Sequence, residues 1–564
     1  MQELNTSLLE RPSGAAQKRE QMIVRSALWA AAGDALGWIT ELASDSLNVK
    51  RRSGTSYIQE PAKWKRVIGG RTGPKVDLPA GTYSDDTQLR LAVSRCIRGD
   101  GVFDAEAFAK IELTVWPTYA LGGGLGTKAA AVSLSRRSTT WFSNFFESGS
   151  QRYIHGGGNG AAMRIQPHVW ASKRSAPDLI LAVLRDSLIT HGHPQGFCGA
   201  VFHALALQES IATCSIPSPD MWGSFVDAFL EIPEILERDP QLAAFWRSAW
   251  ENQSKTTLEQ ALKEAHNSAV SDLHHLLSAA KFMEPEEYPS ALKALGCLTP
   301  EFRGAGLKTA MAAMALAFMH RSSSPEAALI QAANELNSDT DTIATMAGSL
   351  LGVTAEAEPT WSIQDRDYIV HEAKRLADIS AGKPRESFAY PDLARWTPPA
   401  NQLSAIGWLE EDLAIVGLGL LEPIDKEHQV GESVWQWCRL PFGQTILAKR
   451  KTVPEKVSFD QMPGLPVAHV RFAPSPSSAP QQSLGFVENP TRSERPSSRR
   501  NAGTAVKEWS LDDATDEAIR ADFEASIVGN LLNECIDQTQ SIEHAIAFAA
   551  ILAKAKLARQ RKRR

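Results

Sequence analysis

Two short acidic segments carry the residues most able to do chemistry in this chain of 564 residues. Residues 338–342 read Ser-Asp-Thr-Asp-Thr and stand directly before an apolar helical run, 343–353. Residues 84–87 read Ser-Asp-Asp-Thr and also precede a helical run, 89–97. A single Asp at a helix start commonly caps the first amides, but each segment holds more carboxylates than capping uses. We therefore expect the two helix starts to converge.

Carboxylates gathered in this way need a partner. Four of them repel one another, so they must take up protons or bind cations. The donors at hand are carboxylate and hydroxyl oxygens, with no nearby Cys and no HExxH motif. Such ligands favour magnesium, or manganese or calcium, over zinc. Asp339 and Asp341 point the same way in an extended segment, whereas the adjacent Asp85 and Asp86 diverge. The sequence predicts a two-metal centre.

A glycine-rich turn and two histidines are the next candidates. Residues 156–160 (GGGNG) run into a helical segment, and such a loop can bring backbone amides close to a phosphate. Asn159 could donate to a phosphate or a ribose, although a run of this kind can equally be a plain flexible turn. His191 and His193 lie at a helix break. Lone histidines are more often structural, and we expect a ligand contact from His191 before His193.

Two further acids lie near the N-terminus. Asp34 falls within Gly-Asp-Ala-Leu-Gly, and Glu41 comes four residues after Gly37, just past the expected end of a helix over residues 21–36. Asp34 could be a buried hydrogen-bonding residue, and Glu41 a free carboxylate beside the metals. Taken alone, each would be read as a solvated charge.

The elements that must position these residues are helices. Apolar residues recur at helical spacing up to about residue 380, and period-2 alternation is nearly absent there. The expected helices are 104–119, 176–190, 194–212, 258–280, 304–320, 325–336, 341–353 and 365–381, while residues 45–80 are expected to form an irregular surface loop. The fold class is therefore all-α. We expect a polar leader over 1–19, a helical domain over 20–383, a small β-rich or mixed module over 384–472, a disordered Pro/Ser-rich linker over 473–508, and C-terminal helices with a basic tail over 509–564.

Composition excludes several classes of protein. The formal net charge of −6 gives no overall signature of nucleic-acid or membrane binding. The six cysteines are scattered without a CxxC pair, which argues against a disulfide framework and a thiolate zinc site and fits a reducing cytosol. No window approaches the roughly 18 apolar residues of a membrane span, and the N-terminus has no apolar signal core. We expect a cytoplasmic protein.

Five motifs occur in an order that resembles the ADP-ribosylglycohydrolases of the dinitrogenase-reductase-activating type. They are GDALGWITE, SDDTQLRLAV, GGGNGAAMRIQP, THGHPQGFCGAVFHAL and SDTDTIATMAGSLLG, and they lie within residues 20–380. The resemblance implies an orthogonal helical bundle with two magnesium ions, or manganese, at the base of a cleft. It does not extend to residues 386–564.

The resemblance also implies roles for individual residues. The metal ligands would be Ser84, Asp85, Asp86, Asp339, Asp341 and Thr342, with Ser84 standing where the family usually has Thr. Gly158, Asn159, Gly160, Met163 and Arg164 would hold the diphosphate and proximal ribose of ADP-ribose, with His191 beside them and the loop 122–127 near the distal end. Glu41, Asp85, Asp86 or Asp339 would take a proton from the attacking water; the sequence does not choose among them.

Several functions stay open at this point. The first is a metal-dependent hydrolase that removes ADP-ribose from an ADP-ribosylated protein, most simply from arginine. The second is a non-catalytic sensor or scaffold that binds ADP-ribose or a nucleotide. The third is a hydrolase of small ADP-ribose conjugates or of ADP-ribosylated nucleic acid. The C-terminal helices could recruit a partner protein, and the seven basic residues after Ile551 could touch nucleic acid or an acidic partner.

Overall fold

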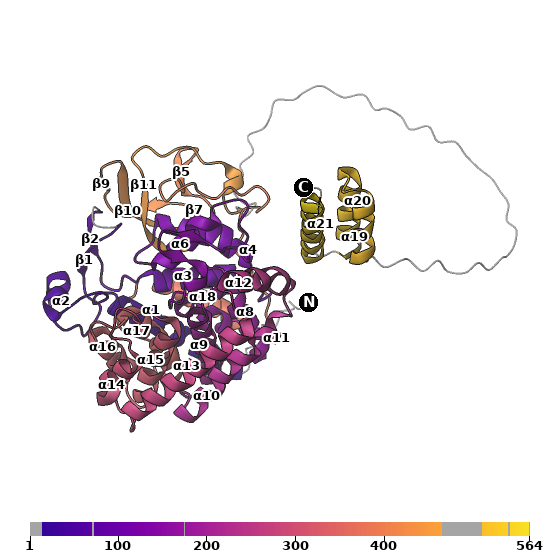
Figure 1. The fold of residues 1–564 in the computed structure, drawn as a ribbon. Helices are drawn as coiled ribbons and strands as arrows, with labels where there is room; N and C mark the ends of the chain where they lie inside the picture. The colour runs from indigo at the N-terminus through magenta and orange to yellow at the C-terminus, as the bar shows by residue number, and fades with distance from the viewer. Residues whose placement is uncertain (1–13, 70–72, 174, 465–509, 540–541, 563–564) are drawn as a thin grey trace, which may run out of the picture. The chain divides into compact units, whose positions relative to one another are not determined.

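The fold is seen in a computed structural model, which describes residues 14–69, 73–173, 175–464, 510–539 and 542–562. Contacts group the chain into two compact units, one up to Leu465 and one from Pro466 onward. The first unit is mostly helical and carries small antiparallel sheets, which confirms the predicted fold class (Figure 1). Among the described helices, none is both long and apolar enough to cross a bilayer.

The first part of the chain, up to residue 170, holds the N-terminal helix, a β-hairpin and the helix that begins at the first acidic segment. Its elements are α1 (Gly14–Gly37), α2 (Ser46–Ser53), β1 (Trp64–Val67), β2 (Lys75–Leu78), α3 (Asp85–Cys96), α4 (Ala105–Ala107), η1 (Phe108–Glu112), α5 (Leu113–Val115), η2 (Trp116–Thr118), α6 (Leu125–Leu134), β3 (Glu147–Ser148), β4 (Gln151–Arg152), η3 (Tyr153–His155), η4 (Ala162–Arg164) and α7 (Gln166–Trp170).

The helical bundle continues to residue 380. Its elements are α8 (Ala176–Ser187), α9 (Pro194–Thr213), α10 (Pro219–Asp227), η5 (Ala228–Glu231), α11 (Ile232–Leu236), η6 (Leu242–Trp246), α12 (Arg247–Ser254), α13 (Leu258–Ala279), η7 (Pro285–Glu287), α14 (Tyr288–Leu295), α15 (Gly306–Met319), α16 (Pro325–Asn334), α17 (Thr340–Thr354) and α18 (Arg366–Ser380).

The rest of the first unit is β-rich, and the second unit is helical. The elements are β5 (Ile406–Leu409), β6 (Asp412–Ile415), β7 (Gly419–Leu420), β8 (Glu422–Pro423), β9 (His428–Val430), β10 (Ser433–Arg439), β11 (Thr445–Lys451), η8 (Phe459–Gln461), α19 (Leu511–Arg520), α20 (Ala525–Thr539) and α21 (Ile542–Lys562). One sheet has the order β5-β6-β7, and the other has β11-β10-β8 with β9 also paired to β10.

The centre of the bundle is the contact between α1 and α17, whose backbones nearly touch. A Cβ atom added at Gly33 would lie 2.3 Å from the carbonyl oxygen of Ala344, and one added at Gly37 would lie 2.3 Å from that of Thr340. Gly348 makes the same approach in the opposite direction, to the backbone of Trp29. Only glycine allows helices this close, so the spacing of these residues fixes where α17 begins relative to the end of α1.

For the N-terminal region, one expectation is wrong, and another, a helix over 104–119, is confirmed as helical but not as a regular α-helix. Residues 45–80 are not an irregular loop, because they contain α2 and the antiparallel hairpin β1–β2, in which Trp64 pairs with Leu78 and Val67 with Lys75. The expected helix over 104–119 is divided into α4, the π-helical η1, α5 and the 3-10 turn η2. Pro117 lies in the first turn of η2, where the α-helical pattern ends.

Three of the predicted segments can be compared with the residues that the structure describes. Helix α1 begins at Gly14, so part of the expected leader is helical, and residues 1–13 lie outside the described residues. The β-rich module belongs to the same compact unit as the bundle. The expected linker over 473–508 lies outside the described residues. In the second unit, α19–α21 share a small core of their own, built on Ala518, Phe523, Leu531, Phe548 and Leu552.

Candidate functional site

The two acidic segments lie at the starts of α3 and α17, and the structure brings them together. The hydroxyl of Thr342 donates to Asp86 Oδ1 at 3.4 Å, which joins two segments 256 residues apart. Burial, followed by the charges of Asp34, Asp85 and Asp339, raises the pKa of Asp86 well above its usual value. The charges of these acids therefore act on one another, as expected if the two helix starts converge.

Asp34 on α1 anchors the start of α3. One carboxylate oxygen accepts from the amide of Ser84 and the other from the amide of Thr87, both at 2.9 Å. The Asp34 side chain is completely buried. Ser84 is the N-cap of α3, and its hydroxyl accepts from the amide of Asp86 at 3.3 Å. Asp34 is therefore a buried hydrogen-bonding residue, and the amides that it binds belong to the acidic segment at the start of α3.

Glu41 completes the acidic cluster, which we define as Glu41, Asp85, Asp86, Asp339 and Asp341. Burial raises the pKa of Glu41, Arg66 opposes that rise, and Asp339 adds to it. Burial, Glu41 and Asp339 raise the pKa of Asp341 well above its usual range. Burial and Glu41 raise the pKa of Asp85 to about 7. These shifts share two causes, burial of the carboxylates and the charges of neighbouring carboxylates.

The acidic cluster fits a hard divalent cation by its chemistry. All its donors are oxygen atoms, and Asp86 Oδ2 is buried without a hydrogen-bond partner, as a ligand atom facing a cation would be. Across the described residues, no three His, Cys, Asp or Glu side chains already form a metal site. The acids therefore lie near one another, but their side chains do not converge on a single position. The ligand set predicted from the sequence stays a prediction.

The glycine-rich turn lies beside the acidic cluster. Asn159 Nδ2 donates to Asp339 Oδ2 at 3.0 Å, and the amide of Asn159 donates to the carbonyl of Gly304 at 2.9 Å. A Cβ at Gly304 would lie 2.8 Å from Asp339 Oδ2, so this glycine leaves room for the carboxylate. Asn159 therefore connects the candidate phosphate loop directly to the candidate metal ligands.

His191 lies against the same turn. A Cβ atom at Gly160 would lie 3.1 Å from the His191 ring and 3.1 Å from Thr127 Oγ1, which brings the loop 122–127 to the same place. Burial, followed by the charge of Arg164, lowers the pKa of His191 to about 3, so the imidazole is neutral. His193 is instead the N-cap of α9, where its Nδ1 accepts from the amide of Gln195.

Met163 and Arg164 lie behind the turn, both on η4. Met163 is buried, and the Arg164 side chain is completely buried. The Arg164 guanidinium donates to Asp186 Oδ1 at 2.9 Å, to the carbonyl of Gly160 at 2.9 Å and to Thr190 Oγ1 at 2.9 Å. The expected contact of this side chain with ADP-ribose gives way to a supporting role, because its donors already hold the turn and the residue before His191.

A basic and aromatic group around Glu41 was missed from the sequence. Both terminal nitrogens of Arg66 donate to Glu41 Oε2 at 2.9 Å. The Arg66 guanidinium also lies 5.1 Å from the ring centre of Trp38 and 5.8 Å from that of Trp64. Arg66 lies on β1. Along β1, and likewise along β2, more buried side chains alternate with exposed ones. That short alternation was the signal available in the sequence.

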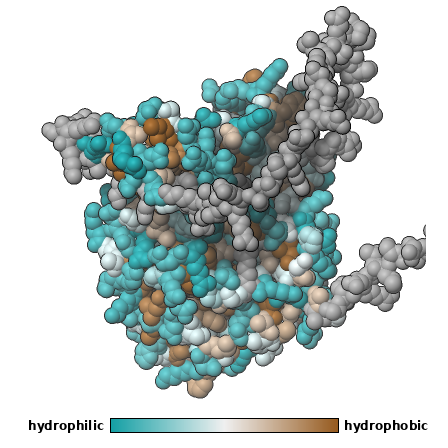
Figure 2. All heavy atoms as spheres, turned by 90° about the vertical axis from the view of Figure 1, so that its right-hand side faces the viewer, coloured by the Kyte–Doolittle hydropathy of each residue, from teal (hydrophilic) through white to brown (hydrophobic). Residues whose placement is uncertain are grey.

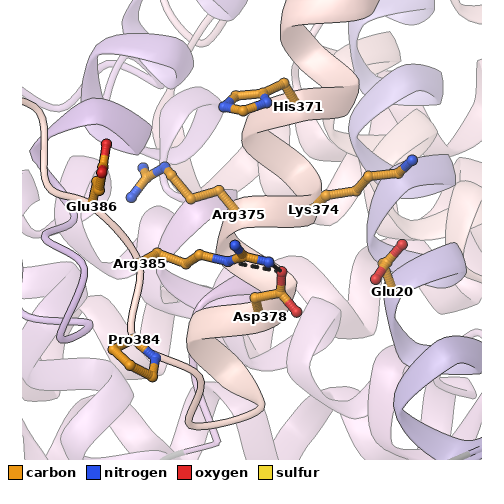
Figure 3. Close-up of a pocket in the computed structure, with 8 residues that line it drawn as sticks. All are labelled: Glu20, His371, Lys374, Arg375, Asp378, Pro384, Arg385 and Glu386. Carbon is orange, nitrogen blue, oxygen red and sulfur yellow. Dashed lines mark hydrogen bonds and ion pairs between the residues drawn. The ribbon is translucent and has the colours of Figure 1, made fainter. Parts of the chain in front are cut away.

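A cavity of about 690 Å³ lies elsewhere, along α18, and Figure 3 shows its lining. Within its lining Arg385 binds Asp378, whereas Arg375 pairs with Glu372, which lies outside the lining. None of the acidic cluster lines this cavity. On the face that Figure 2 shows, hydrophobic side chains are scattered among hydrophilic ones. We therefore place the candidate chemistry at the acidic cluster and not at this cavity.

Comparison with known proteins gives the family. The family model described as ADP-ribosylglycohydrolase matches residues 16–385. The ADP-ribosyl-[dinitrogen reductase] glycohydrolase of Rhodospirillum rubrum is 28% identical over an alignment of 175 residues, which covers 29% of this chain and 49% of that protein. The match therefore spans about half the length of this relative.

A solved structure titled "ADP-ribosylglycohydrolase-related protein complex" is 20% identical and covers 64% of this chain and 99% of its own, with a TM-score of 0.39. A likeness at that TM-score adds nothing to the assignment. The family model alone extends over more than half of the chain and includes all five motifs that carried the resemblance. On that ground the chain belongs to the ADP-ribosylglycohydrolase family, whose members are glycosyl hydrolases.

Proposed function

We propose that this protein is a magnesium-dependent hydrolase that cleaves the glycosidic bond between ADP-ribose and a protein side chain, most simply arginine. The observation that carries the proposal is the acidic cluster: five carboxylates from α3, α17 and the end of α1 lie together beside a glycine-rich turn. Glycosidic bonds are cleaved through a transition state with positive charge on the sugar, which carboxylates stabilise.

The acids would take two kinds of role, and Asp85 and Asp339 could take part in both. Asp86, Asp341 and Thr342 would hold magnesium together with Ser84, Asp85 and Asp339. Bound magnesium, or manganese, supplies Lewis-acid and orienting chemistry for the ribose hydroxyls. In the metal-free protein, burial and Glu41 raise the pKa of Asp85 to about 7. Bound magnesium would lower that pKa, so Asp85 would be an ionised carboxylate able to accept a proton. Glu41 and Asp339 are the other candidates for that transfer, and Arg66 restrains Glu41.

The glycine-rich turn would hold the substrate. Gly158, Asn159 and Gly160 present backbone and amide groups beside Asp339, which suits the diphosphate and the proximal ribose. His191 is a neutral imidazole against Gly160, so it would contribute a hydrogen bond and not a charge. Arg164 would fix the shape of the turn from behind.

The test is an assay with magnesium on a panel of differently linked ADP-ribose substrates. We expect release of ADP-ribose, with the arginine-linked substrate cleaved best, and complete loss on chelation or in Asp341→Ala. The matched control is Asp227→Ala. The Asp227 carboxylate is 70% exposed, pairs with His266 and is not part of the acidic cluster. Full activity of Asp341→Ala in the presence of a chelator would refute the proposal. Tight binding of ADP-ribose without turnover would show a non-catalytic sensor instead.

A further inference from the structure

We propose that the β-rich module, here defined as residues 406–451, positions the acidic cluster and is a working part of the catalytic domain. The family match ends at residue 385, before the module begins. The module nevertheless lies in the same compact unit as the bundle. The inference rests on the proposed function for the reaction itself, but its structural part can be tested without any reaction.

The first contact leads from the module to the start of α3. Thr445, the first residue of β11, donates from its amide to Asp365 Oδ2 at 2.9 Å and from its hydroxyl to Asp365 Oδ1 at 2.6 Å. The hydroxyl of Tyr83 donates to Asp365 Oδ2 at 2.6 Å. Tyr83 is completely buried and directly precedes Ser84, the N-cap of α3. Thr445 therefore reaches the helix start that carries Asp85 through a single bridging carboxylate.

The second contact leads from the neighbouring residue to the other end of α3. Gln444 Oε1 accepts from Arg95 Nη1 at 2.7 Å, and both side chains are buried. The same guanidinium donates to both oxygens of Glu112 at 2.7 and 3.0 Å. Two consecutive residues of the module, Gln444 and Thr445, thus hold the last turn of α3 and the residue before its first turn. Gln444 directly precedes β11 and Thr445 begins it. One short segment of the module therefore contacts the last turn of α3 and, through Asp365 and Tyr83, its start.

The third contact leads to Glu41. The ring of Trp435 on β10 lies against Gly69, where an added Cβ would be 2.6 Å from Trp435 Cζ2. Gly69 has a φ of +85° and follows strand β1, which carries Arg66. Arg66 in turn binds Glu41. Figure 1 shows β10 near the hairpin β1–β2, in keeping with this contact. The module therefore supports both parts of the acidic cluster, from α3 and from the end of α1.

These contacts make Thr445 a positioning residue and not a catalytic one. It acts on Asp85 and Asp86 only through Asp365 and Tyr83. Residues that orient metal ligands from outside commonly change metal affinity or activity by about 10–100-fold when they are replaced. We expect the lower end of that range, about tenfold, because the amide of Thr445 keeps its bond to Asp365 when only the side chain changes.

The experiment compares Thr445→Val with Thr445→Ser. Valine keeps the shape of the side chain and loses the hydroxyl, whereas serine keeps the hydroxyl. Val453→Ser is the control, because Val453 lies just after the module and is 80% exposed. Three quantities are measured on the full chain: kcat and KM for the best substrate of the panel, the dissociation constant for Mn²⁺ by electron paramagnetic resonance, and hydrogen exchange of residues 82–90 without metal.

We expect Thr445→Val to lower kcat about tenfold at little change in KM, to weaken Mn²⁺ binding and to speed exchange at residues 82–90. Thr445→Ser and Val453→Ser should match the unmodified protein. If Thr445→Val also matches it in Mn²⁺ binding and in exchange, the positioning role is overturned. A protein that hydrolyses no substrate refutes the proposed function alone, since the exchange comparison still decides whether the module holds α3.

Discussion

Replacing Asp34 with alanine tests the support of α3 most directly. Its two oxygens accept from the amides of Ser84 and Thr87 at 2.9 Å, and the side chain is completely buried. A hydrogen bond to a charged group contributes about 1.5–3 kcal/mol, and an amide left buried without a partner costs a comparable amount. Burial of the carboxylate raises the pKa of Asp34 and offsets part of this gain. We expect Asp34→Ala to lower the free energy of unfolding by about 3 kcal/mol.

The assay is urea unfolding followed by far-UV circular dichroism, with chelator present so that metal binding does not contribute. Asp45→Ala is the matched control, because Asp45 also caps a helix, α2, but is exposed. Asp45→Ala should lower the free energy of unfolding only slightly, since water can bind the amide that loses its partner. If Asp34→Ala and Asp45→Ala lower the free energy of unfolding equally, the two buried hydrogen bonds to Asp34 do not anchor α3.

Two further outcomes follow from the buried charges. The pKa of Asp85 is near 3.8 in an unfolded chain and is raised to about 7 in the fold by burial and by Glu41, so the metal-free protein holds a proton more tightly when folded. Its stability should therefore fall as the pH rises from about 4 through 7, and magnesium should raise the melting temperature more at pH 8 than at pH 5.5; an equal or larger rise at pH 5.5 would contradict this. Arg164→Met leaves the carboxylate of Asp186 buried without its guanidinium, so unfolding by urea should show a loss of about 3–5 kcal/mol, and a loss below 1 kcal/mol would show that His168 suffices as its partner.

Much of the helical fold could be predicted because its signals are local. The helix expected over 194–212 is α9, Pro194–Thr213, and the one expected over 258–280 is α13, Leu258–Ala279. Pro194 at the first position of α9 and the Thr257 cap of α13 are signals that act within one turn. The family, inferred from five ordered motifs, is confirmed. Local chemistry therefore decides where helices begin.

The supports of the site could not be predicted, because they join segments far apart in the chain. Tyr83 and Asp365 are 282 residues apart, and Arg95 and Gln444 are 349 apart. Nothing in the local sequence around Thr445 identifies it as part of a site, since a polar residue at a strand start is common. Arg66 was hidden for another reason: its strand has only four residues, too few for alternation to stand out from a loop.

Two supports in the fold hold the acids of the acidic cluster near one another. The α1–α17 contact is fixed by backbone packing, since a Cβ at Gly37 would lie 2.6 Å from the Cα of Asp341. The start of α3 is fixed separately, by Asp34 and by Tyr83. Neither support depends on a ligand, so the acids are held together against their own repulsion by the protein alone. A cation entering the acidic cluster replaces the protons that relieve this repulsion in the metal-free protein, where the pKa values of Asp85, Asp86 and Asp341 are raised. Its affinity would therefore draw on negative charge that the fold has already concentrated and would grow as the pH rises.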